Sequence, residues 1–281
     1  YNKLQKLVFN RLGYEDVQFV SPSNDNAYED VSGGKGSKFT MLIWRASVAV
    51  DLLRKMQQER RPYEIINGET NRIYKICLDK VCASVERGGK DLEDVMSESA
   101  DMFRQIQITN GQRKPIIAVV GEIFMRDNPY CSGHLVERLE KLGAETLIAP
   151  FSEWLIYSTY RYTRDSKWKG DWKGILKSKI NMYAQNSSAH KLHHAVGDAI
   201  DAKKEVTVFE MLHACSPYVH KDYDGDPVAS IGSGSVLAGR GISGVVHILP
   251  FTCMPGTLIS SVTPKFRKDH DNIPWENIAY D

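Results

Sequence analysis

Cys253 is the residue of this chain best placed to do chemistry as a thiolate. The apolar run from Val245 to Leu249 is rich in β-branched residues and predicts a buried strand, which Pro250 ends. The residues from Thr257 to Phe266 predict a helix. Cys253 is therefore expected at a strand's carboxyl end, where open α/β sheets bind ligands and where the following helix start favours a negatively charged sulfur. The alternative, a small apolar core residue, stays open.

A second polar loop is expected beside this cysteine. Ile116 to Gly121 form a continuous apolar run that predicts another strand, and the loop after it contains Glu122, Arg126 and Asn128. Because the carboxyl ends of parallel strands meet at one edge of a sheet, the two loops should converge. We expect Glu122, Arg126 and Asn128 to line the resulting cleft and to orient a polar ligand.

The other cysteines are scattered along the chain. Cys131 follows the second loop and is interpreted either as a second ligand or as the neighbour of a helix cap; the latter is favoured because no companion stands at metal-site spacing. Cys77 and Cys82 lie five residues apart on an amphipathic segment, for which core packing is expected. Five cysteines in a chain of 281 residues indicate reduced thiols and a cytoplasmic protein.

The overall composition is that of an ordinary globular protein. A formal charge of +1 provides no general attraction to nucleic acid or to an anionic membrane. No apolar stretch approaches the length of a membrane span, and the N-terminus lacks a signal-peptide pattern. The strongest local basic and aromatic segment runs from Arg161 to Lys179. We interpret it as a solvated helix face with two half-buried tryptophans and not as a single-strand binding surface.

The chain is expected to form an α/β fold, a flavodoxin-like or Rossmann-like parallel sheet domain with an added helical layer. Residues 1–114 are assigned to a partial α/β and helical region. It has a helix from Leu4 to Leu12, a strand from Val17 to Val20, and helices near 39–60, 71–87 and 92–108. The glycine-rich segment Gly33 to Ser37 lacks the Walker spacing and is interpreted as a loop.

Residues 115–281 are assigned to one α/β domain with a helical insertion at about 151–201. A strand, a helix at 132–142 and a second strand at 145–149 form a βαβ unit with parallel strands. Helices follow near 206–214 and 228–239, and Trp275 to Ala279 is expected to form a last helix. The glycines at 232–241 precede a helix and a strand, so they indicate close helix packing or an anion-binding helix start and not a dinucleotide fingerprint. A zinc pair among His190, His193 and His194 is disfavoured because no HExxH pattern accompanies it.

Several spaced motifs resemble one protein family. They are Gly-Glu-Ile-Phe-Met-Arg-Asp-Asn-Pro at 121–129, Leu-Gly-Ala-Glu at 142–145, Ala-Pro-Phe-Ser-Glu-Trp at 149–154 and Pro-Phe-Thr-Cys-Met-Pro-Gly-Thr at 250–257. These residues resemble the large activase-related proteins of the 2-hydroxyacyl-CoA dehydratase superfamily, in which a BadF/BadG-type ATPase module is often fused to a dehydratase-like module. The likeness covers most of the chain and is strongest from Pro115 onward.

The resemblance implies stacked flavodoxin-like domains with an iron–sulfur cluster held between them by cysteines. It also implies an ATP-hydrolysing activase that supplies low-potential electrons for dehydration of a 2-hydroxyacyl-CoA. Cys253 matches a cluster-ligating cysteine, whereas Cys131 matches no family cysteine. The family's other cluster cysteines are expected upstream of Tyr1, so this chain alone should not hold a complete cluster.

The leading hypothesis is an iron–sulfur dehydratase-like or reductase component that receives electrons from an ATPase partner and acts on a 2-hydroxyacyl-CoA or a similar small substrate. The alternative is a non-catalytic electron-relay or scaffold module that docks on the activase through the aromatic segment after Phe151. A small-molecule-binding α/β protein without a metal is a third, weaker possibility. A homodimer or heterodimer is compatible with each of these hypotheses.

Overall fold

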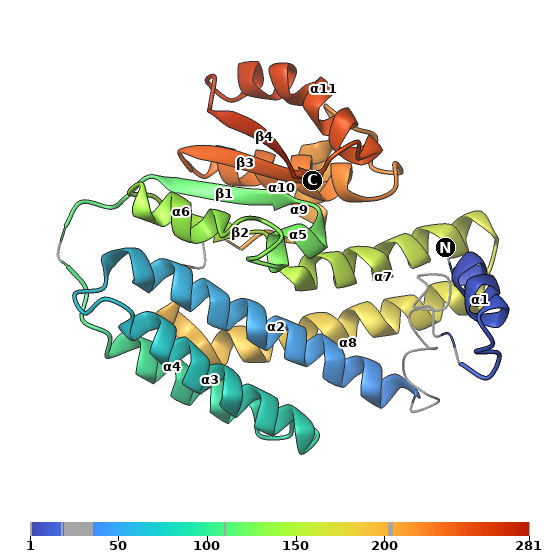
Figure 1. Cartoon of the computed structure of the whole chain (residues 1–281), viewed down its shortest axis with the longest axis horizontal. Coiled ribbons are helices and arrows are strands. Elements are labelled where there is room, and N and C mark those ends of the chain that lie inside the picture. Colours follow the sequence, from blue (N-terminus) through green and yellow to red (C-terminus); the bar gives the residue numbers. More distant parts are fainter. Residues whose placement is uncertain (1, 18, 20–35, 110, 202–204, 281) are drawn as a thin grey trace.

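The computed structural model describes residues 2–17, 19, 36–109, 111–201 and 205–280. A parallel β-sheet with helices on both faces lies against a layer of long helices (Figure 1). This arrangement confirms the expected α/β fold with an added helical layer. No helix within these residues is both long enough and apolar enough to cross a membrane.

The sheet has four strands in the order β2-β1-β3-β4, and every neighbouring pair is parallel. The strands are β1 (Ile116–Gly121), β2 (Glu145–Ile148), β3 (Gly244–Pro250) and β4 (Trp275–Tyr280). The central strands β1 and β3 are largely buried, as their mainly apolar sequences predict, and the burial includes His247 of β3. Their pairing confirms the expectation that both carboxyl ends lie on one edge of the sheet.

Side chains alternate between the two faces of the sheet. Ala118 and Val120 of β1 face a core shared with α10 and α11, whereas Val119 faces a core that contains Met125 and Leu135. The helices concerned are α5 (Ile123–Asp127), α6 (Leu135–Lys141), α10 (Asp226–Gly239) and α11 (Met254–Asp269). Helix cover on both faces explains why β1 and β3 carry apolar residues without alternation.

The glycine-rich segment near residue 232 lies inside α10 and serves close packing. A Cβ at Gly232 would stand 2.3 Å from the carbonyl oxygen of Met211 in α9 (Val208–Cys215). A Cβ at Gly234 would stand 2.9 Å from the ring of Trp275. Of the two expectations for these glycines, close helix packing is therefore confirmed.

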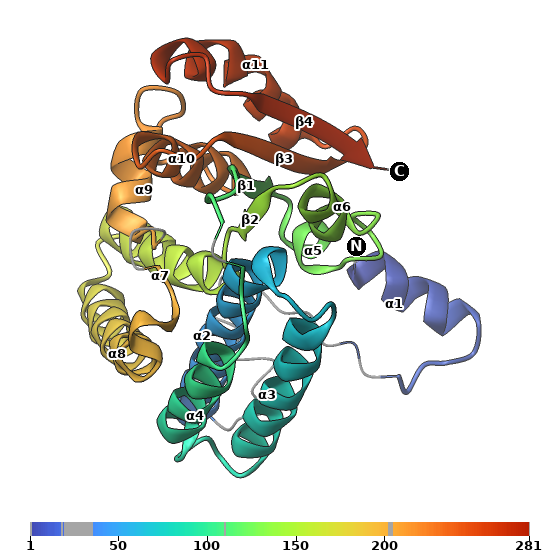
Figure 2. The same cartoon turned by 90° about the vertical axis from the view of Figure 1, so that its left-hand side faces the viewer.

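The helical layer is built from both halves of the chain. Its helices are α2 (Gly36–Arg60), α3 (Glu69–Glu86), α4 (Leu92–Arg104), α7 (Phe151–Trp168) and α8 (Trp172–Val196), with the short helices η3 (Arg61–Tyr63) and η4 (Gly197–Ala199). Leu192 and Val196 of α8 are buried among residues of α2, α3 and α4. Figure 2 shows α8 in the same layer as these helices. The indole N–H of Trp44 in α2 also donates to the carbonyl oxygen of Gln185, at 2.9 Å. The segment 151–201 therefore packs on the sequence-distant first third.

Helix α2 and the turn after it hold the helical layer against the sheet. The side-chain oxygen of Gln58 accepts the backbone N–H of Ile148 on the outer edge of β2, at 3.3 Å. The guanidinium of Arg61 donates to both carboxylate oxygens of Glu140, at 2.6 and 3.0 Å. These contacts satisfy an open strand edge and fix the two layers to each other.

One sequence expectation about local structure was wrong, and two others fall partly outside the described residues. Trp275–Tyr280 is a strand and not a helix, because its backbone pairs along the edge of β3 and tertiary pairing overrides local preference. The expected strand at 17–20 is not formed at Val17 or Phe19, and residues 18 and 20 lie outside the described residues. Of the glycine-rich segment expected to be a loop, Gly36 and Ser37 begin α2, and residues 33–35 lie outside the described residues. The amphipathic helix near the N-terminus is present as α1 (Asn2–Arg11).

Candidate functional site

The strand order reverses direction between β1 and β3. The strand that follows β1 in the chain, β2, pairs with one edge of β1, and the next strand, β3, pairs with the opposite edge. In open α/β sheets, the crevice at the carboxyl ends of two such strands is the usual ligand position. The loop after β1 and the loop after β3 both begin there, so this edge is the natural candidate site.

The two loops leave the sheet in close contact. A Cβ at Gly121 would stand 2.0 Å from the carbonyl oxygen of Ile248, and the φ angle of Gly121 is +120°. Only glycine fits this position, because a side chain would collide with the backbone of β3. The next backbone N–H, that of Glu122, donates to the carbonyl oxygen of Ile248 at 3.0 Å.

Cys253 stands at the start of α11 on this edge. It is the N-cap residue of the helix and is partly exposed, and its carbonyl oxygen accepts the N–H of Thr257 at 3.0 Å. No side chain caps the first turn of α11, so N–H groups near the sulfur lack an intrahelical partner. The helix was expected to begin at Thr257 but begins three residues earlier, because Pro255 fits the first helical turn.

The residue before the cysteine has an unfavourable backbone conformation. Thr252 has a φ angle of +62°, in the left-handed region. For a β-branched residue this conformation is an outlier and destabilises the chain by roughly 1–3 kcal/mol. Such conformations cluster at functional sites. The backbone at 251–253 is thus bent to present Cys253 at the sheet edge, between Pro250 and α11.

Exposed apolar side chains adjoin this cysteine in the chain and also follow β1. Phe251 and Met254 are 66% and 70% exposed, and Phe124 in α5 is 64% exposed. Tyr130, in the turn after α5, is also exposed. Large apolar side chains gathered at one edge of a domain are typical of a surface that another polypeptide covers.

The three polar residues expected to line the cleft have structural contacts instead. A carboxylate oxygen of Glu122 accepts the N–H of Met125 at 2.8 Å and caps α5. The amide oxygen of Asn128 accepts the N–H groups of Tyr130 and Cys131, at 3.0 and 3.3 Å, and shapes the turn. Both residues therefore use a side-chain oxygen to shape the backbone of the segment after β1.

Arg126 is buried and points into the protein. Its guanidinium donates to the carbonyl oxygens of Gly121 at 3.3 Å and Pro150 at 3.2 Å, which ties together the ends of β1 and β2. The positive charge of Arg126 also interacts electrostatically with the buried carboxyl of Glu153. Burial raises the pKa of Glu153 and the positive charge of Arg126 lowers it, with burial the larger effect. Arg126 therefore belongs to the inner wall of the sheet edge, beneath the loops.

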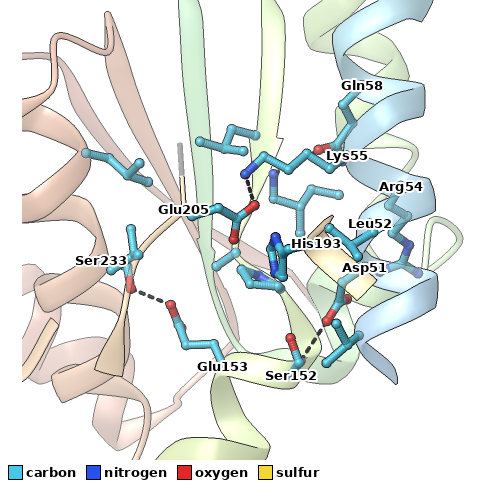
Figure 3. A pocket seen from close by; sticks show the side chains of 17 residues that line it. Asp51, Leu52, Arg54, Lys55, Gln58, Ser152, Glu153, His193, Glu205 and Ser233 are labelled. Carbon is cyan, nitrogen blue, oxygen red and sulfur yellow. Dashed lines mark hydrogen bonds and ion pairs between the residues drawn. The ribbon is translucent and has the colours of Figure 1, made fainter. Parts of the chain in front are cut away.

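A cavity of about 60 Å³ lies between the helical layer and the sheet (Figure 3). Four of its polar side chains form two pairs: Ser233 donates to Glu153 at 2.5 Å, and Lys55 forms an ion pair with Glu205. A space of this size accommodates a few water molecules, whereas sites for cofactor-sized ligands measure about 300–1,000 Å³. As it stands, the cavity does not hold a CoA thioester.

Asp51 joins this cavity to the start of α7. Its carboxylate oxygens accept the N–H groups of Phe151 at 3.1 Å and Ser152 at 2.8 Å, so α2 caps the N-terminus of α7 (Figure 3). Burial raises the pKa of Asp51 to about 6 despite these bonds. The role of Asp51 was not predictable from local sequence because its partners are a hundred residues away. Glu153 offered a usable signal, since it is an acidic residue in the first turn of a helix.

The five cysteines are all free thiols with different surroundings. Cys77 and Cys215 are buried, Cys131 is partly exposed and Cys82 is exposed, which contradicts the expectation of core packing for Cys82. Burial raises the pKa of the Cys215 thiol to about 11. In the part of the chain that the structure describes, no group of three or more His, Cys, Asp or Glu residues is arranged to hold a metal ion. His190, His193 and His194 are likewise not part of any such group.

Comparisons with protein-family models, with curated proteins and with solved structures returned no match for this chain.

Proposed function

We propose that this chain is a component of an iron–sulfur redox protein and that Cys253 supplies one thiolate ligand to the cluster. The observation that carries the proposal is the position of Cys253 at the switch point of the sheet, on an uncapped helix start and after a strained Thr252. Thiolates are the usual ligands of such clusters, and nearby N–H groups tune their potential. The resemblance of residues 250–257 to a cluster-binding motif agrees with this position.

The described residues fit a single ligand and not a whole cluster site. Clusters of this type are commonly held by four cysteines, and the described residues offer no group of three metal ligands. The remaining ligands must therefore come from a partner or from another part of the polypeptide. The exposed Phe251, Met254 and Phe124 are suited to contact that second surface and to keep water from the thiolate. A bound cluster would supply one-electron transfer.

The proposed component receives low-potential electrons from an ATP-hydrolysing activase and acts on a 2-hydroxyacyl-CoA or a similar small substrate. The resemblance supports both parts of this assignment. Five free cysteines support a cytoplasmic location, where thiols stay reduced. The contribution of this chain is to hold the thiolate of Cys253 at a fixed position and to present the surface that closes over it.

One observation favours the second candidate, a non-catalytic electron relay or scaffold. The cavity between the helical layer and the sheet measures about 60 Å³, and four of its polar side chains pair with one another. A dehydratase needs room for the thioester beside its redox centre, which this cavity lacks. A relay needs only the exposed edge around Cys253.

The ligand assignment is tested with the full-length protein, reconstituted anaerobically with iron and sulfide. Cys253→Ser should lower iron per chain and bleach the visible absorption of the cluster, while far-UV circular dichroism stays unchanged. Cys131→Ser is the matched control, because Cys131 is also partly exposed but matches no cysteine of the family that the chain resembles. Full iron content in Cys253→Ser would end the proposal.

Catalyst and relay are separated by a second assay. The reconstituted protein is mixed with ATP, its reduced activase and either a panel of 2-hydroxyacyl-CoA thioesters or a low-potential dye. Dehydration of a thioester identifies the catalyst. Reduction of the dye with every thioester left intact identifies the relay.

A further inference from the structure

Helix α8 carries an exposed apolar stripe along one side. Trp172, Leu176, Ile180 and Tyr183 are each more than half exposed and are spaced by four, four and three residues. At about 100° per residue they fall within a sector roughly 80° wide and extend over about three turns. We call these four residues the α8 seam. Trp168, at the end of α7, is also exposed and shortly precedes the seam in the chain. The expectation of half-buried tryptophans was therefore wrong.

The helix that carries the seam is held firmly on its other side. The carboxylate of Asp171 caps its first turn by accepting the N–H of Gly174 at 3.0 Å. Gly174 and Ser178 are buried, and Leu192 and Val196 lie in the core of the helical layer. The seam is thus a preformed surface, which lowers the entropy lost when a partner binds.

Lysines border the seam on both sides. Lys179 lies about 20° beyond one edge of the apolar sector and Lys173 about 20° beyond the other. From Lys167 to Tyr183 the chain has five lysines and one aspartate, in a protein whose overall charge is close to zero. A narrow apolar stripe with flanking charges is the pattern of a helix–helix seam, in which the flanking charges select the partner.

We propose that the α8 seam binds an amphipathic helix of a partner protein whose apolar face is flanked by aspartate and glutamate. The lysines disfavour pairing of the seam with the same seam of a second copy, because like charges would face each other. The narrow sector, with Leu176 near its centre and Ile180 one turn further along, matches the i, i+4 anchors of helix recognition and not the wide apolar face of a membrane-bound helix. The proposal is independent of Cys253 and of any cluster.

The test uses the full-length protein and two synthetic helical peptides with the same leucine seam, one flanked by glutamate and the other by lysine. Fluorescence anisotropy should show binding of the glutamate peptide, about tenfold weaker or worse binding of the lysine peptide, and loss of affinity at high salt. The double variant Leu176→Glu/Ile180→Glu should bind the glutamate peptide about tenfold more weakly than the unchanged protein does. The matched control is Ile65→Glu/Ile66→Glu, which adds two charges at equally exposed apolar residues outside α8.

Four results would overturn the proposal. They are failure of the glutamate peptide to bind, equal binding of both peptides, binding to phosphatidylserine and phosphatidylcholine vesicles in place of the peptide, and a concentration-dependent dimer that Leu176→Glu/Ile180→Glu abolishes. Circular dichroism of both double variants checks that the fold is kept. None of these results bears on the amount of iron bound per chain, so this test and the test of Cys253 can fail separately.

Discussion

The backbone N–H of Glu122 donates to the carbonyl oxygen of Ile248 at 3.0 Å, one residue beyond the paired part of β1 and β3. This bond extends the contact between the two strands into the loop that leaves β1. As a result, the loop of Glu122 and the loop of Cys253 start from neighbouring points on one sheet edge. A change at this junction should disturb both loops together.

Gly121→Ala should destabilise the protein by about 2–4 kcal/mol, because the new Cβ would stand 2.0 Å from the carbonyl oxygen of Ile248 in a conformation that favours glycine. Gly143→Ala is the control. Gly143 also has a positive φ, of +98°, but no atom lies within 4 Å of the added Cβ, so only about 1 kcal/mol is expected. Urea unfolding measures both changes in the free energy of unfolding. Equal losses would show that the close approach of β1 and β3 is not as described.

Stability should fall as pH rises from about 4 to about 6, in part because of Asp51. Burial raises its folded-state pKa to about 6 from the ordinary value of 3.8. In this window the folded state binds more protons than the unfolded state, so the contribution of Asp51 is complete below pH 4 and is lost above pH 6. The loss should be about 1–3 kcal/mol. The raised pKa of Glu153 acts in the same direction.

Asp51→Asn isolates this contribution, because the amide has no charge to bury. The difference in unfolding free energy between the unchanged protein and Asp51→Asn should change across pH 4–6 and stay constant from pH 7 to 8. A difference that does not vary with pH would show that Asp51 titrates at its ordinary pKa.

The central strands were predictable from sequence because their signals are local. Val245 to Leu249 and Ile116 to Gly121 are mainly apolar runs that favour burial, and their common sheet edge follows from the parallel arrangement. Trp275–Tyr280 was not recognised as a strand, because its six residues show no clear period and depend on pairing with β3. Packing of α8 on α2 joins segments about 140 residues apart, which no local pattern encodes.

The candidate site was predictable in position but not in side-chain direction. Cys253 lies at the expected sheet edge, since strand ends and helix starts are encoded locally. Glu122 and Asn128 use their oxygens to cap their own loop, and Arg126 turns inward to two carbonyl oxygens. Whether a polar side chain faces a ligand or the backbone depends on partners such as Pro150 that only the folded chain supplies.

Alkylation should sort the five thiols by accessibility. In the native protein without added metal, iodoacetamide should modify Cys82, Cys131 and Cys253, which are exposed or partly exposed. Cys77 and Cys215 should stay unmodified until the protein unfolds, because both are buried and burial raises the pKa of each thiol. Mass spectrometry of peptides from native and urea-treated samples makes the comparison. Protection of Cys253 in the native protein would contradict its placement at an accessible edge.

Arg126 and Glu153 should be energetically coupled in the folded protein. Arg126→Met should destabilise by about 2–4 kcal/mol, because the carbonyl oxygens of Gly121 and Pro150 lose their donor and the buried Glu153 loses its compensating charge. Glu153→Gln alone keeps an acceptor for Ser233 and removes the charge, so a smaller loss is expected.

In the double variant the loss should be less than the sum of the single losses by about 1 kcal/mol or more, since no unpaired charge is left. Urea unfolding of the four proteins completes the cycle. Additive losses would mean that Arg126 acts only on the two carbonyl oxygens and that Glu153 is neutral when folded.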